Sequence, residues 1–504
     1  MSNLSEEGRV PINEKGTGTP PEKLESVNNV GLEGYQTVDA ETEKRLLKKL
    51  DRRLIPMICW IYLMNFMDRV NIGNARLYDM ELELGMTGSQ YNLAVAVLFI
   101  TYCLFETPSN LIIKRLKPAR YLGGLMLAWG LVATFSAFVN NFAALVACRL
   151  LLGTFEAGLF PGILLYQTIF YNKRQISLRN AYFYATSAAA GAVGGLVAYG
   201  IGTMDNDGAG TAGWRAWRWI ILINGIPTVL TAFAVPWVLP NSPETASFLT
   251  EEDRRNLVIM RNSEIGATKN ASELHKEDVM DGVKDWKIYA WSIAQFCGHS
   301  VLYSFSVFLP TIIQGMGTWD TAQIQALTVP VYAVGAATYI TCALISDRIQ
   351  QRAIFCFGGG IVMILGYCLL IANQSVAMSF AGCFLVAIGL WTSTGTSMAW
   401  INVNNPRYGK RAYASGMLIT IGNSAGVASP FLFAKKDAPS YRPGYGATIG
   451  MLLLALVLHV TIWWCLRRAN QRKLAGKEDW RVEGKTEEEA AELGEDNPRY
   501  LYTT

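Results

Sequence analysis

The chain has 504 residues, of which 51% are hydrophobic and 17% are charged, and its formal net charge at pH 7 is +4. Soluble proteins carry about 25% charged residues, so the composition excludes an ordinary soluble protein. The lack of a long basic stripe excludes a nucleic-acid-binding protein. The charged residues concentrate at the two ends and in short clusters. The stretches between them are apolar over roughly 20 residues, the length at which a helix crosses a bilayer.

Residues 1–53 form a polar tail that we expect to lie in the cytoplasm. Residues 1–40 are rich in Gly, Pro, Glu, Asn and Ser, a composition that favours disorder. Residues 41–53 place Leu46, Leu47 and Leu50 on one side of a charged helix. This pattern predicts an amphipathic helix that lies on the membrane surface and leads into the first span.

Twelve apolar segments follow and predict an all-α membrane protein with twelve transmembrane helices. A polar loop over residues 240–285 divides them into two six-helix halves, residues 54–239 and residues 286–467. The charged residues 468–504 predict a solvated cytoplasmic tail. The segments lie near residues 54–72, 90–113, 120–139, 142–166, 180–202, 218–239, 286–313, 323–346, 353–372, 377–400, 411–434 and 446–467.

The basic residues of the short loops predict the orientation of the chain. Cytoplasmic loops carry an excess of Lys and Arg. The loops that follow even-numbered segments hold twelve such residues, against six in the loops that follow odd-numbered segments, so we expect both termini in the cytoplasm. The twelve are Lys114, Arg115, Lys117, Arg120, Lys173, Arg174, Arg179, Arg348, Arg352, Arg407, Lys410 and Arg411, and the six are Arg76, Arg215, Arg218, Lys435, Lys436 and Arg442.

The first apolar segment contains an adjacent acid and base, Asp68 and Arg69. Adjacent residues of a helix point about 100° apart, so these side chains need not pair with each other. In one interpretation Arg69 faces a central cavity and binds an anion, while Asp68 takes up protons. In the other, both charges mark the end of the helix and reach the lipid headgroups.

The fourth segment contains Arg149 and Glu156 in the run RLLLGTFEAGLFPG. Seven residues are two helical turns, so both side chains share one face with a rise of about 10 Å. A charge at the centre of a span costs roughly 2.5–3.5 kcal/mol on insertion scales and requires a partner or a water-filled cavity. Glu156 is therefore a candidate for proton coupling, with Arg149 as its partner or as a substrate-binding residue. The alternative is a structural ion pair. Pro161 predicts a break or kink beyond Glu156.

Three further charged residues are candidates for gating. Glu106 in the second segment is assigned either to a cytoplasmic-side gate or to the solvated end of its helix. Asp347 and Arg348 close the eighth segment. They are candidates for ion pairs that hold the inward gate shut.

The second half offers polar candidates for substrate contact. His299 and Tyr303 lie one helical turn apart in the seventh segment, and Asn423 lies in the eleventh. Each is a candidate to line a central cavity, and a packing hydrogen bond is the alternative for His299.

The sequence contains no pattern of a known enzyme class. It lacks a P-loop, a GxSxG motif and an HExxH motif. Its nine cysteines form no CxxC pair, and its three histidines are widely spaced. We therefore expect no enzyme activity, no metal site and no cofactor, so that transport would be driven by a gradient.

Four motifs carry a resemblance to a known family: LDRRLIPMICWIYLMNFMDRVNIGNARL, RLLLGTFEAGLFPG, GWRAWRWIILINGIPTVL and NSPETASFLTEEDR. The chain resembles the anion:cation symporter family of the major facilitator superfamily, and in particular its fungal allantoate/nicotinate permease branch. The resemblance implies the major facilitator fold, Arg69 for substrate, Asp68 and Glu156 for protons, and Arg149 as partner to either. The loop NLIIKRLKPARYLGG departs from the superfamily signature because its acidic residue is missing.

The leading hypothesis is a plasma-membrane proton symporter that imports a small organic anion by alternating access and acts as a monomer. Tyr182, Tyr184, Tyr303 and Trp391 would suit an aromatic carboxylate such as nicotinate. One alternative is a proton-antiport exporter of a secondary metabolite or drug. Another is a nutrient sensor that binds a ligand without transporting it.

Overall fold

The computed structural model describes residues 38–504 except 114–115, 172, 204–212, 266–274, 434–436 and 439–440. Every regular element in these ranges is a helix, which confirms the all-α class. Of residues 1–40, which were expected to be disordered, residues 1–37 lie outside the described residues, whereas Asp39 and Ala40 form the start of α2.

The helices fall into two halves joined by a central segment. The first half comprises α2 (Ala40–Arg76), α3 (Met80–Glu83), α4 (Gly88–Ile113), α5 (Pro118–Phe135), α6 (Phe142–Glu156), α7 (Leu159–Phe170), α8 (Lys173–Gly202) and α9 (Ala216–Val238). The central segment holds α10 (Glu251–Ile265) and α12 (Lys276–Lys284). The second half comprises α13 (Trp286–Gln314), α14 (Thr321–Ile349), α15 (Ala353–Ala372), α16 (Val376–Val403), α17 (Tyr408–Ala428) and α18 (Arg442–Leu474), and α19 (Glu487–Glu492) follows.

Eleven spans in the described part of the chain are long and apolar enough to cross a membrane. The expected first span is not among them, although it lies inside the long helix α2. The reason is its content of polar residues, since Asn65, Asp68, Arg69 and Asn71 lower its hydropathy. All four are buried within the protein, so α2 stands in the bundle as a twelfth helix whose polar groups are shielded from lipid.

The amphipathic lead-in is the beginning of α2 and not a separate helix on the membrane surface. Asp39 caps this helix, since its side chain accepts hydrogen bonds from the N–H groups of the first turn. Leu46 and Leu50 are fully buried against protein, and Lys49 Nζ lies 2.5 Å from Asp253 Oδ2 of α10. The apolar stripe was predicted correctly, but protein covers it in place of lipid.

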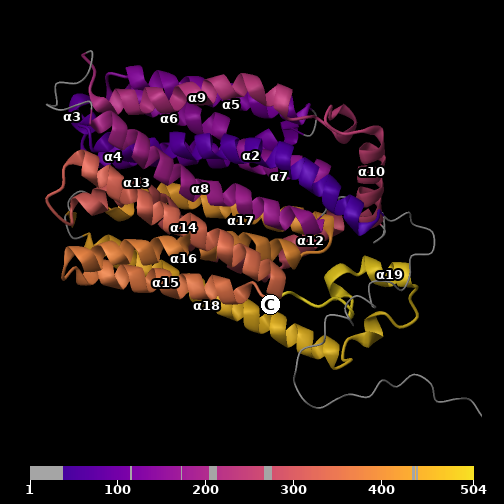
Figure 1. The fold of residues 1–504 in the computed structure, drawn as a ribbon. Coiled ribbons are helices and arrows are strands. Elements are labelled where there is room, and N and C mark those ends of the chain that lie inside the picture. Colours follow the sequence, from indigo (N-terminus) through magenta and orange to yellow (C-terminus); the bar gives the residue numbers. More distant parts are fainter. Residues whose placement is uncertain are drawn as a thin grey trace, which may run out of the picture.

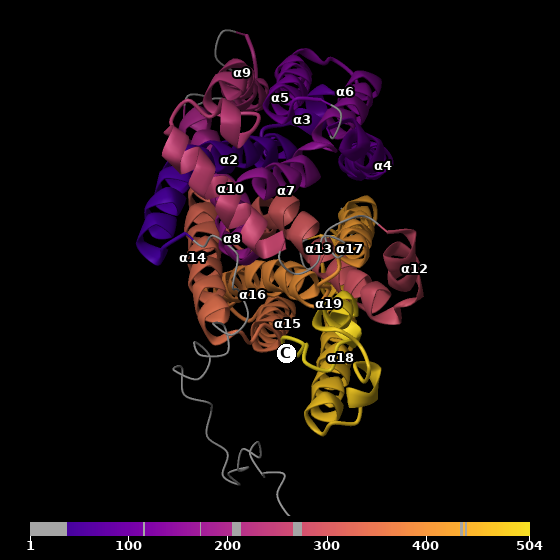
Figure 2. The same cartoon turned by 90° about the vertical axis from the view of Figure 1, so that its right-hand side faces the viewer.

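The two halves lie side by side with their helices roughly parallel (Figure 1). The helix pairs that connect them include α8 with α14, α4 with α17, α2 with α13, and α8 with α16. We call the end of the bundle that bears α10, α12 and α19 the inner end (Figure 2), and the opposite end, near α3, the outer end.

The halves are in close contact toward the outer end. Gly73 of α2 packs so closely on the backbone of Val307 in α13 that a Cβ atom at position 73 would overlap it. The guanidinium of Arg76 lies 4.3 Å from the ring centre of Tyr91 and 5.6 Å from that of Phe308. This arrangement closes the outer side of the central region.

The fourth span is interrupted between α6 and α7, directly after Glu156. Pro161 has no N–H to donate to the carbonyl of Ala157, and its ring crowds that carbonyl. Gly158 fits at the break because a Cβ atom there would overlap the Ser109 hydroxyl of α4. The predicted break is confirmed, and it places Glu156 at the end of a helix.

Candidate functional site

Arg69 and Glu156 form a buried ion pair between α2 and α6. Nη2 and Nε of Arg69 lie 2.7 Å and 3.1 Å from Oε2 of Glu156, and the Glu156 side chain is fully buried. The other oxygen, Oε1, has no hydrogen-bond partner among the described residues. The sequence did not predict this pair, because it left open whether Arg149 is the partner of Glu156.

Aromatic rings cover the Arg69 guanidinium. Its central carbon lies 4.8 Å from the ring centre of Tyr102 and 5.6 Å from that of Phe99, both on α4. These two residues were not singled out from the sequence. Their spacing of three residues, which places them on one face of a helix, was the available signal.

Asp68 faces away from Arg69, into the interior of the first half. Its Oδ2 accepts a hydrogen bond of 3.0 Å from the Thr228 hydroxyl of α9. The expectation that adjacent charges need not pair is confirmed. The geometry connects Asp68 to the packing of α2 against α9, while its predicted role in proton uptake stays a prediction.

Arg149 differs from the other buried charges of the site in its surroundings. It is 4% exposed, and Nε has no hydrogen-bond partner. No carboxylate of the described residues lies within ion-pair distance of its guanidinium. Two helical turns separate it from Glu156, a rise of about 10 Å along α6, and Glu156 is engaged with Arg69.

Arg149 lines a small cavity between the two halves. The other lining residues include Arg69, Val95, Phe99, Tyr303 and Ser306, so both arginines border the same space. The cavity has room for about one water molecule. In this conformation the site is therefore closed around a volume smaller than an organic substrate.

His299, Tyr303 and Asn423 lie together in the second half, but of these three predicted residues Tyr303 alone lines the cavity that holds Arg69 and Arg149. The Tyr303 hydroxyl donates a hydrogen bond of 2.7 Å to Asn423 Oδ1, and the Tyr303 ring lies 4.4 Å from that of Phe99 across the interface between the halves. The His299 ring lies 5.6 Å from that of Tyr303, and Nε2 of His299 lies 2.9 Å from Nε2 of Gln295.

The candidate gating residues separate into two places. Glu106 is 4% exposed on α4, one turn beyond Tyr102, and lies near Asn423, so it belongs to the central cluster. Asp347 lies at the inner end of α14, where its Oδ1 is 3.3 Å from Nη2 of Arg352 in the same half. Arg348 is exposed. A gating role for all three stays a prediction.

Further aromatic contacts connect the halves beside this cluster. Trp391 Nε1 of α16 donates a hydrogen bond of 2.9 Å to the Ser187 hydroxyl of α8, and the Tyr184 and Thr394 hydroxyls lie 3.2 Å apart. Tyr184 and Trp391 are thus interface residues in this conformation.

Comparison with known proteins shows the family of the chain. Residues 58–430 match the model of the Major Facilitator Superfamily. An uncharacterized transporter of Schizosaccharomyces pombe is 35% identical over 438 residues, covering 86% of each chain. The chain belongs to the major facilitator superfamily of membrane transporters.

Two further likenesses are more distant. The high-affinity nicotinic acid transporter of Saccharomyces cerevisiae is 27% identical over 474 residues, which cover 93% of this chain and 86% of that one. The fold is similar to the crystal structure of a bacterial homologue of the human lysosomal transporter Spinster in an inward-facing, unoccupied conformation. That likeness has a TM-score of 0.63 at 14% identity and covers 84% of this chain and 98% of the other.

Proposed function

We propose that the protein is a proton-coupled symporter that imports a small organic anion, with Arg149 as the residue that holds the anion. The observation that carries the proposal is a buried guanidinium in a cavity between the halves, which no carboxylate of the described residues neutralises. A charge at this depth requires a counter-ion or water. An anionic substrate supplies that counter-ion, and the second arginine on the cavity wall, Arg69, is within the same space.

The Arg69–Glu156 pair supports the coupling to protons. While Glu156 is ionised, it occupies Arg69. A proton on Glu156 removes this competing charge, so that Arg69 joins Arg149 in binding the substrate carboxylate. Loss of the proton restores the ion pair and expels the anion. Proton and anion thereby move together, as the anion:cation symporter branch would require.

The aromatic rings favour a flat carboxylate as the substrate. Phe99, Tyr102 and Tyr303 surround Arg69 and the cavity, and an aromatic acid such as nicotinate would stack on them while its carboxylate meets the arginines. The likeness to a nicotinic acid transporter supports this choice of first candidate. We place both termini in the cytoplasm, as the basic loops predict, and we assign the protein to the plasma membrane because the proposed activity is import.

Uptake into proteoliposomes tests the proposal. Radiolabelled nicotinate and other small carboxylates are offered with the outside at pH 5.5 and the inside at pH 7.5. We expect at least one of them to accumulate, a protonophore to abolish the accumulation, and Arg149→Ala to lower uptake at least about 100-fold, since a lost charge-assisted contact costs about 3 kcal/mol. The matched control is Arg442→Ala, an exposed arginine at the start of α18.

The outcomes separate the parts of the proposal. Anion uptake that ignores both the pH gradient and the protonophore contradicts proton coupling. Uptake by Arg149→Ala at the rate of the unaltered protein contradicts the assignment of Arg149. Efflux of a neutral or cationic compound, with no anion uptake, supports an exporter in its place.

A further inference from the structure

Residues 492–504, which we call the docked segment, lie against the inner ends of the second-half helices. After α18 the chain turns back through α19 and a short helical turn at Gly494–Asp496, and then continues without regular structure. In Figure 1 this stretch returns along α18 toward the bundle. The sequence predicted a solvated tail here, because the residues are highly charged. The structure shows that much of this polarity is used in specific contacts.

Two asparagines of the bundle bind the backbone of the docked segment. Asn404, at the end of α16, donates to the Thr503 carbonyl at 3.0 Å and accepts from the Thr503 N–H at 2.9 Å. Asn470 of α18 makes the same pair of bonds with Tyr502, both at 2.8 Å. Each side-chain amide thus bonds both the N–H and the C=O of one residue. A sheet edge binds an extended peptide through the same two backbone groups. Trp400 Nε1 adds a bond of 2.8 Å to the Thr503 carbonyl.

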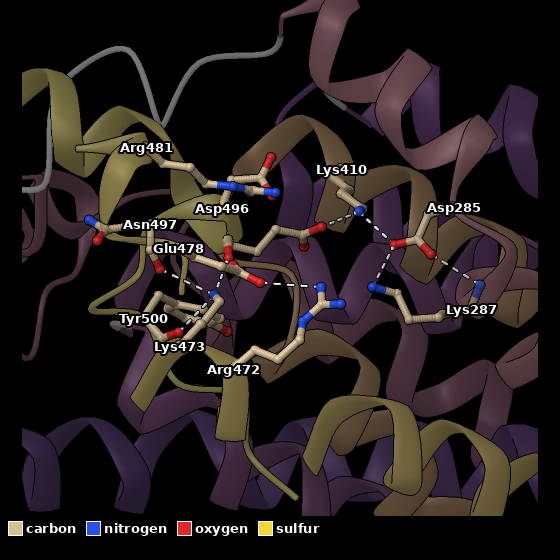
Figure 3. A network of polar contacts seen from close by, with 11 residues as sticks. Asp285, Lys287, Lys410, Arg472, Lys473, Glu478, Arg481, Asp496, Asn497 and Tyr500 are labelled. Carbon is tan, nitrogen blue, oxygen red and sulfur yellow. Dashed lines mark hydrogen bonds and ion pairs between the residues drawn. The ribbon is translucent and has the colours of Figure 1, made fainter. Parts of the chain in front are cut away.

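Lys473, in the last turn of α18, is satisfied by the docked segment. Its Nζ donates to the carbonyls of Glu495, Asn497 and Tyr500 at 2.5, 3.1 and 2.9 Å. An ammonium group has three donors, so every one is taken up by the segment. The residue is 6% exposed, and Figure 3 shows its side chain directed at these carbonyls.

Two basic residues at the start of α17, Lys410 and the preceding Arg407, connect the docked segment to the central segment. Lys410 Nζ lies 2.5 Å from Glu495 Oε1 and 2.6 Å from Asp285 Oδ2, the residue that caps α13 (Figure 3). Arg407, which precedes α17, donates to the Glu492 carbonyl at 2.6 Å and pairs with Asp278 of α12. Lys410 and Arg407 thus each bind an acidic residue near the end of the central segment and a residue of the docked segment.

We propose that the inner face of the second half is a peptide-binding site whose ligand is the docked segment, and that its docking fastens α12 to this half. Hydrogen bonds and ion pairs supply many of the contacts, Tyr502 packs against an apolar cluster of the second half, and Leu501 is 47% exposed. Contacts of this kind open locally without unfolding of the protein. The central segment connects the two halves along the chain. Release of the docked segment therefore loosens the attachment of α12 to the second half. This inference is independent of the transported substrate.

Hydrogen exchange on the full-length protein in detergent tests the proposal. We expect the amides of Tyr502 and Thr503 to exchange at least about tenfold more slowly than in a synthetic peptide of residues 492–504. The double variant Asn404→Ala/Asn470→Ala is expected to bring them within about threefold of the peptide and to raise exchange in α12, with α5 unchanged. Gln471→Ala and Lys477→Ala, both exposed neighbours on the same stretch, are the controls and should change neither region.

A second measurement avoids substitutions altogether. Guanidinium chloride below the concentration of global unfolding weakens these hydrogen bonds and buried ion pairs, so exchange in the docked segment and in α12 should rise together in the unaltered protein. Exchange of the segment at the rate of the free peptide overturns the binding site. Release of the segment that leaves α12 as protected as before overturns the link to the central segment.

Discussion

At the scale of single residues, four buried charges of the first half differ in their partners. Asp68 is held by Thr228 inside the first half, and Glu156 is held by Arg69. Arg149 alone lines the cavity without an acidic partner among the described residues. Sequence spacing placed Arg149 and Glu156 on one face, but only the structure shows that Glu156 pairs with Arg69 and not with Arg149.

The variant Glu156→Gln separates binding from coupling. It removes the negative charge that competes for Arg69, so we expect anion exchange between two sides of equal pH to continue. Accumulation driven by a pH gradient should fall at least about tenfold, because no proton is carried. Counterflow and gradient-driven uptake in the same proteoliposomes measure the two activities.

The control for that experiment is Glu252→Gln, an exposed acid on α10, which should leave both activities unchanged. If Glu156→Gln still accumulates the anion against its gradient, the proton is carried by another group and our assignment of Glu156 is wrong.

At the scale of helices, close packing positions the site. Gly153 lies on α6 between Arg149 and Glu156, and a Cβ atom there would overlap the Leu98 carbonyl and the Thr101 hydroxyl of α4. Because α4 also carries Phe99 and Tyr102, the approach of these two helices sets how the rings meet Arg69.

Gly153→Ala should therefore damage both stability and uptake. Overpacking costs about 1–3 kcal/mol, and we expect a lower apparent melting temperature together with weaker anion binding. Gly124→Ala on α5 is the control, because a Cβ atom there meets nothing within 4 Å. A scan of thermal unfolding with and without the anion measures both effects, and equal melting temperatures for the two variants would contradict this account of the packing.

The Asp285 bridge predicts a pH dependence of stability. Burial alone would raise the pKa of Asp285, but Lys287 and Lys410 outweigh burial and hold the pKa below its ordinary value of 3.8. A lowered pKa in the folded state stabilises the protein above the pKa of the unfolded state, and this contribution is lost as the pH falls through the folded value.

The unaltered protein should thus melt at a higher temperature than Asp285→Asn at pH 7 and at pH 5, with equal differences. Hydrogen bonds to charged groups contribute about 1.5–3 kcal/mol, which sets the size of the effect. The difference should shrink only below pH 3.8, the ordinary value. A difference that already vanishes between pH 7 and pH 5 would show that Asp285 is not held as an ion.

The sequence predicted most of the helices and the break after Glu156, because hydropathy, proline and length act locally. It also named several of the residues that meet in the central cluster, including Tyr303 and Asn423, but not Phe99 or Tyr102. Their pairings were beyond it, since the contact of Arg69 with Glu156 joins residues 87 positions apart. The docked segment was missed for the same reason. A charged stretch is expected to be solvated unless residues distant in the sequence, here Asn404 and Lys473, bind it.

At the scale of the whole molecule, the halves are closed toward the outer end and must separate there during alternating access. Gly73→Ala should oppose this closure, because its Cβ atom would overlap the backbone of Val307. The test uses a cysteine introduced at Ser306 in a cysteine-free background. We expect this cysteine to react severalfold faster with a membrane-impermeant maleimide, added from the outer side, in the Gly73→Ala variant than in the protein that keeps Gly73. Gly200→Ala, which meets nothing within 4 Å, should leave the labelling rate as it was.

The polar character of α2 has a consequence for how the protein is made. During synthesis α2 reaches the membrane before its partners exist, since Glu156 follows Arg69 by 87 residues and Thr228 follows Asp68 by 160. Uncompensated charges disfavour entry of an isolated helix into lipid, so we expect α2 to reach its final position only after α6 and α9 have been synthesised. The charges at the centre of the site would then influence the order in which the membrane bundle is assembled.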